Sequence, residues 1–273
     1  MFARPMLPAV AVLAFLGPAP AVRAEATSVP QTRAVEAAFT RVVARGPFDV
    51  EIRGGAAASV VVFAAPGRHE LVRTLVKDGS LVIEPASREQ AREDVRVSVT
   101  LPSLEGIELA GSGSVRAEAG PEPRDVGLAL RGSGSLAWSG ATRSLSAEVD
   151  GSGNLRVDGP APSLHAAVSG SGNLAYRGTA KSVTLAVAGS GDARLDGRGD
   201  SLKVATTGSG RVDARGFAAR DVEISTAGSG DVAVRVAGGS VTATLVGSGD
   251  VEWSGEGRVG GVQVLGSGRF RHL

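Results

Sequence analysis

Apolar and polar side chains alternate with a period of two along most of the chain beyond residue 105. The alternation surrounds a repeated Gly-Ser-Gly tripeptide. Two, four and six positions before the first glycine, the residues are mostly apolar, as in Leu145, Ala147 and Val149, and the residues between them are polar or small. A period of two is typical of a strand with one buried face. The pattern therefore predicts a strand before each tripeptide.

The alternation resumes after each tripeptide. The second residue beyond it is apolar in all nine copies: Val115, Leu136, Leu155, Leu174, Ala193, Val212, Val232, Val251 and Phe270. A further glycine follows in most copies, for example Gly140, Gly159 and Gly178. Each unit thus consists of a strand, a glycine turn, a second strand and a bend, and it contains no stretch with helical periodicity.

The tripeptide recurs at an almost constant interval. Its first glycines, the predicted turn glycines, are Gly111, Gly132, Gly151, Gly170, Gly189, Gly208, Gly228, Gly247 and Gly266, with successive spacings of 21, 19, 19, 19, 19, 20, 19 and 19 residues. One such unit cannot bury its own apolar stripe, whereas stacked units form a continuous core. The sequence predicts an all-β fold, a right-handed single-stranded parallel β-helix (β-solenoid) with rungs of about 19 residues. Glycine suits the turns because it reaches positive φ without steric cost.

The extent of the Gly-Ser-Gly repeat along the chain indicates the domain organisation. Residues 105–273 carry the regular rungs, and residues 39–104, which are β-rich but lack the tripeptide, are expected to form irregular rungs that cap one end of the same domain. A solenoid needs such covers because its terminal strands expose unpaired edges. At the other end, Phe270 and Arg271 are expected to act as a lid.

The N-terminus has the layout of an export signal. Arg4 precedes an apolar run from Met6 to Leu16, and small residues lead to Ala24, so we predict a signal peptide over residues 1–24 and a linker over 25–38. The apolar run is shorter than the roughly 20 residues of a membrane helix, and no later stretch approaches that length. We expect an exported protein without a transmembrane anchor in its mature chain, located in the periplasm, on the outer surface or in the medium.

Composition excludes several classes of function. The absence of cysteine removes disulfides, thiolate metal sites and a catalytic cysteine. Without Arg4 and Arg23, the 29 basic residues become 27, against 28 acidic residues. A near-neutral chain lacks the concentrated basic face of a nucleic-acid-binding protein, so we expect no nucleic acid as a partner. No motif indicates a cofactor.

Three β-rich segments precede the repeats in a fixed order. They are Pro47-Phe48-Asp49-Val50-Glu51-Ile52, Asp78-Gly79-Ser80-Leu81-Val82-Ile83 and Val97-Ser98-Val99-Thr100-Leu101-Pro102-Ser103-Leu104. Followed by serial Gly-Ser-Gly, this order resembles the bacterial family called putative auto-transporter adhesin head GIN domain, over about residues 46–270. The resemblance implies an exported right-handed β-helix related in shape to pectin-lyase-like folds, with a role in cell adhesion and without known catalytic residues. The chain departs from a true autotransporter because it shows no C-terminal membrane barrel segment.

One polar column offers candidate metal ligands. The residue just after each tripeptide is Ser114, Ser135, Asn154, Asn173, Asp192, Arg211, Asp231, Asp250 or Arg269. Asp231 and Asp250 fall on neighbouring rungs and are the candidates for a cation site. The alternative is a solvated polar ladder, which we favour because calcium-binding glycine-rich repeats have a nine-residue period and an aspartate in every copy.

Aromatic residues offer a second candidate site. Trp138, Tyr176 and Trp253 share one repeat position and could form a sugar-stacking surface, but the same position holds Val157, Leu195 and Val234, which favours core filling. The three histidines lie far apart in the sequence, and no catalytic triad or metal-ligand spacing is visible.

The sequence therefore favours a non-enzymatic exported module for cell adhesion or envelope scaffolding. Its expected partners are a cell-surface glycan or an envelope protein. The alternative is a polysaccharide-acting enzyme with a pectin-lyase-like β-helix, which rests on shape alone.

Overall fold

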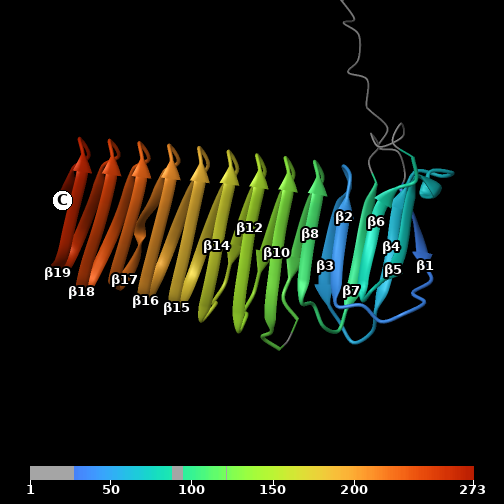
Figure 1. The fold of residues 1–273 in the computed structure, drawn as a ribbon. Helices are drawn as coiled ribbons and strands as arrows, with labels where there is room; N and C mark the ends of the chain where they lie inside the picture. Colours follow the sequence, from blue (N-terminus) through green and yellow to red (C-terminus); the bar gives the residue numbers. More distant parts are fainter. Residues whose placement is uncertain (1–27, 88–94, 121) are drawn as a thin grey trace, which may run out of the picture.

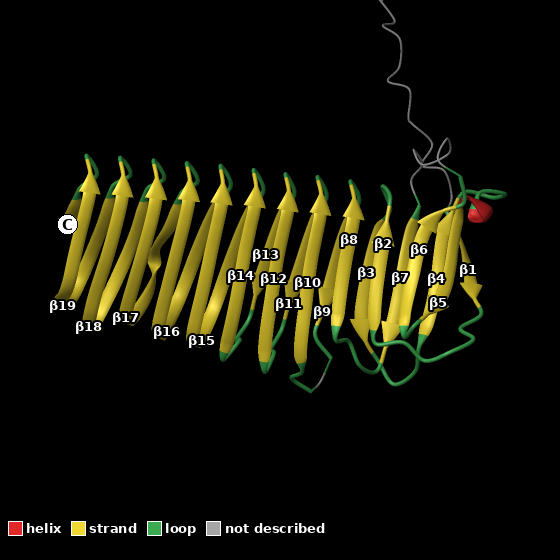
Figure 2. Cartoon of the chain, in the orientation of Figure 1, coloured by secondary structure: helices red, strands yellow, loops and turns green. Residues whose placement is uncertain are grey.

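The computed structural model describes residues 28–87, 95–120 and 122–273. The predicted signal peptide lies outside these residues. Parallel strands stack into an elongated β-solenoid, as predicted, and strands are its dominant secondary structure (Figure 2). In Figure 1 the chain rises along the near face, crosses at the top and descends along the far face while it advances towards the C-terminus, so the coil is right-handed.

One parallel sheet, here the first sheet, contains the strands that precede the tripeptides together with two strands from the region before the repeats. In spatial order they are β6 (Ser80–Pro85), β2 (Arg41–Arg45), β8 (Gly106–Gly111), β10 (Asp125–Gly132), β12 (Ser144–Gly151) and β14 (Ser163–Gly170). The strands that follow the turns form the second sheet: β7 (Arg96–Leu101), β3 (Asp49–Gly54), β9 (Ser114–Glu118), β11 (Ser135–Ser139) and β13 (Asn154–Asp158).

Towards the C-terminus each strand runs through the bend and contributes to both sheets. These long strands are β15 (Asn173–Gly189), β16 (Asp192–Gly208), β17 (Val212–Gly228), β18 (Val232–Gly247) and β19 (Val251–Gly266). The short β20 (Phe270–His272) pairs with the start of β19. Because a residue on one rung pairs with its equivalent on the next, Leu155 lies beside Leu174, which lies beside Ala193, and Val212 follows. The predicted apolar columns are confirmed, and they form one core between the two sheets.

Two features of the structure require glycine at the first position of each tripeptide: a positive φ and a close approach to the preceding rung. Gly170 has a φ of +100°, and a Cβ there would lie 2.7 Å from the carbonyl oxygen of Gly151 on the preceding rung. That carbonyl is also an acceptor, because the backbone N–H of Ser171 donates to it at 2.9 Å. All nine first glycines of the tripeptides have positive φ. The tripeptide therefore fixes both the chain reversal and the close approach between rungs.

The strands before the repeats lie at one end of the coil, and their rungs do not follow sequence order. Strand β2 lies between β6 and β8, and β3 lies between β7 and β9. The rung formed by β6 and β7 is therefore outside the rung that precedes it in the chain. Beyond it, antiparallel strands close the end: β5 (Val72–Lys77) on β6, and β4 (Ser59–Ala64) on β7.

The segment predicted as a linker contains a strand. Strand β1 (Val29–Arg33) pairs antiparallel with β4, and a short 3-10 helix, η1 (His69–Leu71), lies beside it. The Arg33 guanidinium donates to the carbonyl oxygens of His69, at 2.5 Å, and Val72, at 3.3 Å. The linker prediction is wrong for these residues because backbone pairing with β4 orders them despite their exposed side chains. No helix within the described ranges has the length and hydrophobicity that a membrane span requires.

Candidate functional site

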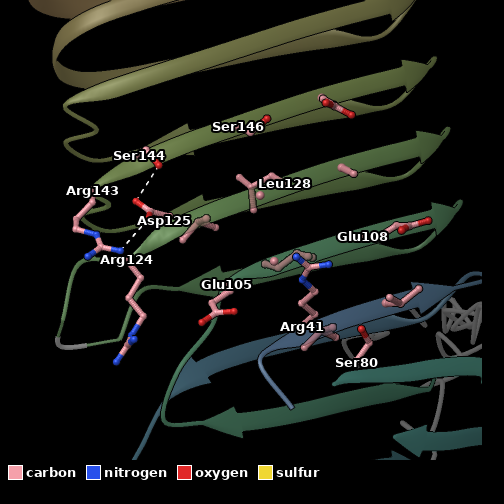
Figure 3. A pocket seen from close by; sticks show the side chains of 18 residues that line it. Arg41, Ser80, Glu105, Glu108, Arg124, Asp125, Leu128, Arg143, Ser144 and Ser146 are labelled. Atoms are coloured by element: carbon pink, nitrogen blue, oxygen red, sulfur yellow. Dashed lines mark hydrogen bonds and ion pairs between the residues drawn. The ribbon is translucent and has the colours of Figure 1, made fainter. Parts of the chain in front are cut away.

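An open recess of about 690 Å³ lies on the outer face of the first sheet. It spans β2, β8, β10 and β12, close to the capped end (Figure 3). Its floor is the exposed side of the sheet, and its rim carries charged and hydroxyl side chains.

Two glycines without a structural need for glycine create this recess. Gly106 and Gly127 are paired on adjacent strands, between Arg41 on one side and Ser146 on the other. Neither has positive φ. A Cβ at Gly127 would have its nearest neighbour at 3.9 Å and one at Gly106 at 3.4 Å, so each position has room for a side chain. The two glycines therefore add no side chain where most other rungs have one. The backbone of Gly127 is half-buried, and the Arg41 side chain covers that of Gly106.

The rim carries both hydrogen-bond donors and acceptors. Asp125 accepts bonds from the Arg143 guanidinium at 2.7 Å and the Ser144 hydroxyl at 2.9 Å. The hydroxyl of Ser144 and then the guanidinium of Arg143 lower the pKa of Asp125 below its ordinary value, so this carboxylate stays ionised. Glu105 accepts a bond from the Thr40 hydroxyl at 3.1 Å.

Arg41 and Glu148 line the recess from different strands. The Arg41 side chain extends from β2 across Gly106 on β8 (Figure 3). Neither residue forms an ion pair with any other residue that the structure describes. Both charges are thus available to a ligand. The recess combines a flat floor with separated donors and acceptors, which suits a neutral, hydroxyl-rich molecule better than an ion of either sign.

The residues singled out from the sequence lie elsewhere. The Oδ1 atom of Asp231 accepts the backbone N–H of Asp250 at 3.0 Å, and Asp250 in turn accepts the N–H of Arg269 at 2.9 Å. No group of three histidine, cysteine or acidic side chains suited to a metal ion occurs among the described residues. The structure thus shows a backbone-capping ladder at the position considered for a cation.

The aromatic candidates belong to the core. Trp138, Tyr176 and Trp253 are almost fully buried, with exposed fractions of 2%, 1% and 6%. The core interpretation is confirmed, and a sugar-stacking surface of these three residues is excluded. Tyr176 donates its hydroxyl to the carbonyl oxygen of Thr179 at 3.1 Å, and burial raises its pKa to about 12.

The recess was not predicted from the sequence, although the sequence contains two signals of it. Gly106 and Gly127 each stand five residues before a tripeptide, where other copies carry Ser146, His165 or Thr184. The interval of 21 residues between Gly111 and Gly132 also adds two residues to the connection beside the recess, which carries Arg124. The contribution of Arg41 had no such signal, because the order of the first rungs is not sequential.

Comparison with known proteins identifies a matching family. The family model described as "Putative auto-transporter adhesin, head GIN domain" matches residues 38–195 and 176–257. No protein with a curated functional description is similar enough in sequence to count as a relative.

Solved structures share the fold. A putative adhesin from Parabacteroides distasonis is 18% identical, with a TM-score of 0.64 over 91% of this chain and 98% of its own. A putative adhesin from Parabacteroides merdae is 17% identical, with a TM-score of 0.64 over 91% and 97%. A putative lipid binding protein from Parabacteroides distasonis is 21% identical, with a TM-score of 0.61 over 89% and 96%. At these identities the likeness establishes the fold.

Proposed function

The chain belongs to the family "Putative auto-transporter adhesin, head GIN domain", and from that premise we propose that it is an exported, non-enzymatic adhesion module that holds a cell-surface glycan in the recess of the first sheet. The observation that carries the proposal is the pair Gly106 and Gly127. Neither backbone conformation nor packing requires glycine at these positions, and the missing side chains open the floor of the recess.

The chemistry of the recess fits sugar hydroxyl groups. A pyranose ring has an apolar face, which can lie on the backbone of Gly127 beside the Ala129 methyl group. Its hydroxyl groups both donate and accept, and they match a rim on which Arg41 and Ser146 donate while Glu105 and Glu148 accept. Charged groups of both signs disfavour a strongly anionic or cationic ligand.

The electrostatics of Asp125 argue against its acting as the proton donor of a glycoside hydrolase. Glycoside hydrolysis requires a carboxylic acid with a raised pKa as the proton donor. Asp125 has the opposite property, because Ser144 and Arg143 lower its pKa. A polysaccharide-acting enzyme remains the alternative that the experiment must test.

A binding experiment with a matched pair of variants tests the proposal. The purified protein is applied to a glycan array and to whole bacterial cells, beside Gly127→Leu, which fills the recess, and Thr184→Leu, which adds the same side chain to the same column three rungs away. We expect Gly127→Leu to weaken glycan binding at least about tenfold, the loss of one or two good contacts. Thr184→Leu should bind as the unaltered protein does, and both should melt normally.

Two results contradict the proposal. Equal binding by Gly127→Leu and the unaltered protein would place the ligand elsewhere. Release of unsaturated or shortened sugars from polysaccharides incubated with the protein would establish the enzymatic alternative.

A further inference from the structure

The two ends of the solenoid differ in how they are covered. At the N-terminal end, antiparallel strands β4 and β5 pair with the outermost rung, and β1 pairs with β4. At the C-terminal end, β20 pairs only with Val251, Glu252 and Trp253 at the start of β19. The second half of β19 pairs with β18 on one side, and no described strand pairs with its other edge.

The lid expected from Phe270 and Arg271 therefore covers half of this end. The Phe270 ring stacks on Trp253 with a centroid distance of 6.3 Å, and the His272 ring lies 4.0 Å from the Trp253 ring. These contacts close the second sheet. No strand among residues 28–87, 95–120 and 122–273 gives β19 an equivalent cover at the end of the first sheet.

The core columns reach the surface at this open edge. Val262 and Val264 continue the columns of Ala243 and Leu245. Their exposed fractions are 37% and 41%, against 1% for each of the residues that precede them in the columns. Val259 and Leu265 are also exposed. An unpaired strand with exposed apolar side chains is a template for pairing with another strand, and residues 259–266 contain neither proline nor charge to prevent it.

We propose that two copies of the chain associate tail to tail through this edge, with β19 pairing antiparallel to β19 of the second copy and Gln263 on the two-fold axis. The sequence Val262-Gln263-Val264 reads the same in both directions. Antiparallel pairing centred on Gln263 sets Val262 against Val264 of the second copy, and both valines face the core. Gln263 faces outwards, next to its own equivalent, where two amides can exchange hydrogen bonds.

A second copy fits this end better than any other partner for two geometric reasons. A partner must pair with the β19 edge of the first sheet and the β20 edge of the second sheet at the same time. The C-terminal end of a second copy presents both edges at the same separation. At the N-terminal end the first sheet is edged by β5, which carries the exposed charged residues Arg73 and Lys77, so it is a poorer template for a head-to-tail contact. When a surface binds the same surface of a second copy, assembly stops at a dimer.

The dimer has a consequence for adhesion, which rests on the proposed function. The recess lies near the capped end and β19 forms the opposite end (Figure 1). Two copies joined at β19 carry their recesses at the two far ends of one rod. Such a rod can bridge two glycan-bearing surfaces, and on a single surface it gains from bivalent attachment.

A charge-complementation experiment on the full chain tests the dimer independently of any glycan. Light scattering with size-exclusion chromatography should give twice the chain mass for the unaltered protein. Gln263→Glu and Gln263→Lys each set like charges against each other across the axis, so each should weaken dimerisation at least about tenfold. An equimolar mixture of the two variants should restore the dimer, because opposite charges then meet. Gln263 is exposed, so neither change disturbs the core.

The control is Ala205→Glu, which adds a carboxylate to the same outward column three rungs inside the coil. It should leave the dimer intact. A monomeric mass for the unaltered protein at all concentrations would overturn the proposal. A dimer that tolerates both single substitutions, or a mixture that stays monomeric while each variant retains its β-sheet circular dichroism, would overturn it as well.

Discussion

The carboxylate of Asp231 accepts a hydrogen bond from the backbone N–H of Asp250 on the next rung. Asp192 makes the same contact with the N–H of Arg211 at 3.0 Å, and Asp250 with that of Arg269. Each aspartate therefore satisfies a backbone donor of the following rung just after a turn. Two carboxylates on adjacent rungs are thus each hydrogen-bonded to a backbone amide.

Asp231 should contribute to stability through this hydrogen bond. We expect Asp231→Ala to lower the free energy of unfolding by about 1 kcal/mol, the net value of a typical hydrogen bond. Asp231→Asn keeps an acceptor oxygen and should lose less. Urea denaturation measures both. The melting temperature should be the same with calcium and with a chelator, and a rise with calcium that Asp231→Ala abolishes would show that a cation binds.

The turn glycines and the recess glycines should respond oppositely to alanine. Gly170→Ala combines positive φ with a Cβ 2.7 Å from a carbonyl oxygen, so we expect a loss of at least about 2 kcal/mol. Gly127→Ala meets nothing closer than 3.9 Å and should raise stability by up to about 1 kcal/mol, because alanine restricts the unfolded chain. Thermal unfolding compares the two variants. A similar loss in both would contradict the distinction between required and dispensable glycines.

Tyr176 should make the protein less stable at alkaline pH. Its pKa is about 12 in the folded protein, against 10.0 for an ordinary tyrosine. Between these values the unfolded chain has lost the proton while the folded chain keeps it, so the free energy of unfolding falls as the pH rises above about 10. Tyr176 is the only tyrosine, so ultraviolet absorbance of tyrosinate reports it alone. In Tyr176→Phe this part of the pH dependence should vanish, and an ordinary tyrosinate titration in the folded protein would refute the prediction.

Leu174 should contribute to the free energy of unfolding because it belongs to a continuous apolar column. It lies between Leu155 and Ala193 and is 2% exposed. We expect Leu174→Ala to cost about 2–5 kcal/mol, because the neighbouring rungs are fixed by backbone pairing and cannot close the cavity. Urea denaturation gives the value. A loss well below 1 kcal/mol would mean that the rungs relax independently of one another.

The repeat region was predictable because its information is local. Side chains such as Leu155 and Leu174 occupy equivalent positions in successive copies, and a constant period sets the register that places them side by side. The same logic placed Trp138, Tyr176 and Trp253 inside. Residues 39–104 lack such a marker. The position of β2 between β6 and β8 depends on pairing between segments far apart in the chain, and alternation within each strand does not choose its neighbour.

By itself, the sequence determined the β-solenoid, its turns and the inward or outward direction of each side chain in the rungs, because glycine conformation and a period of two act within a few residues. Tertiary structure alone decided which strands cap the N-terminal end, which edge of β19 stays open, and that Arg41 lies beside Gly106. These features arise where strands distant in sequence come together, and there the free energy of packing and backbone pairing selects the neighbour.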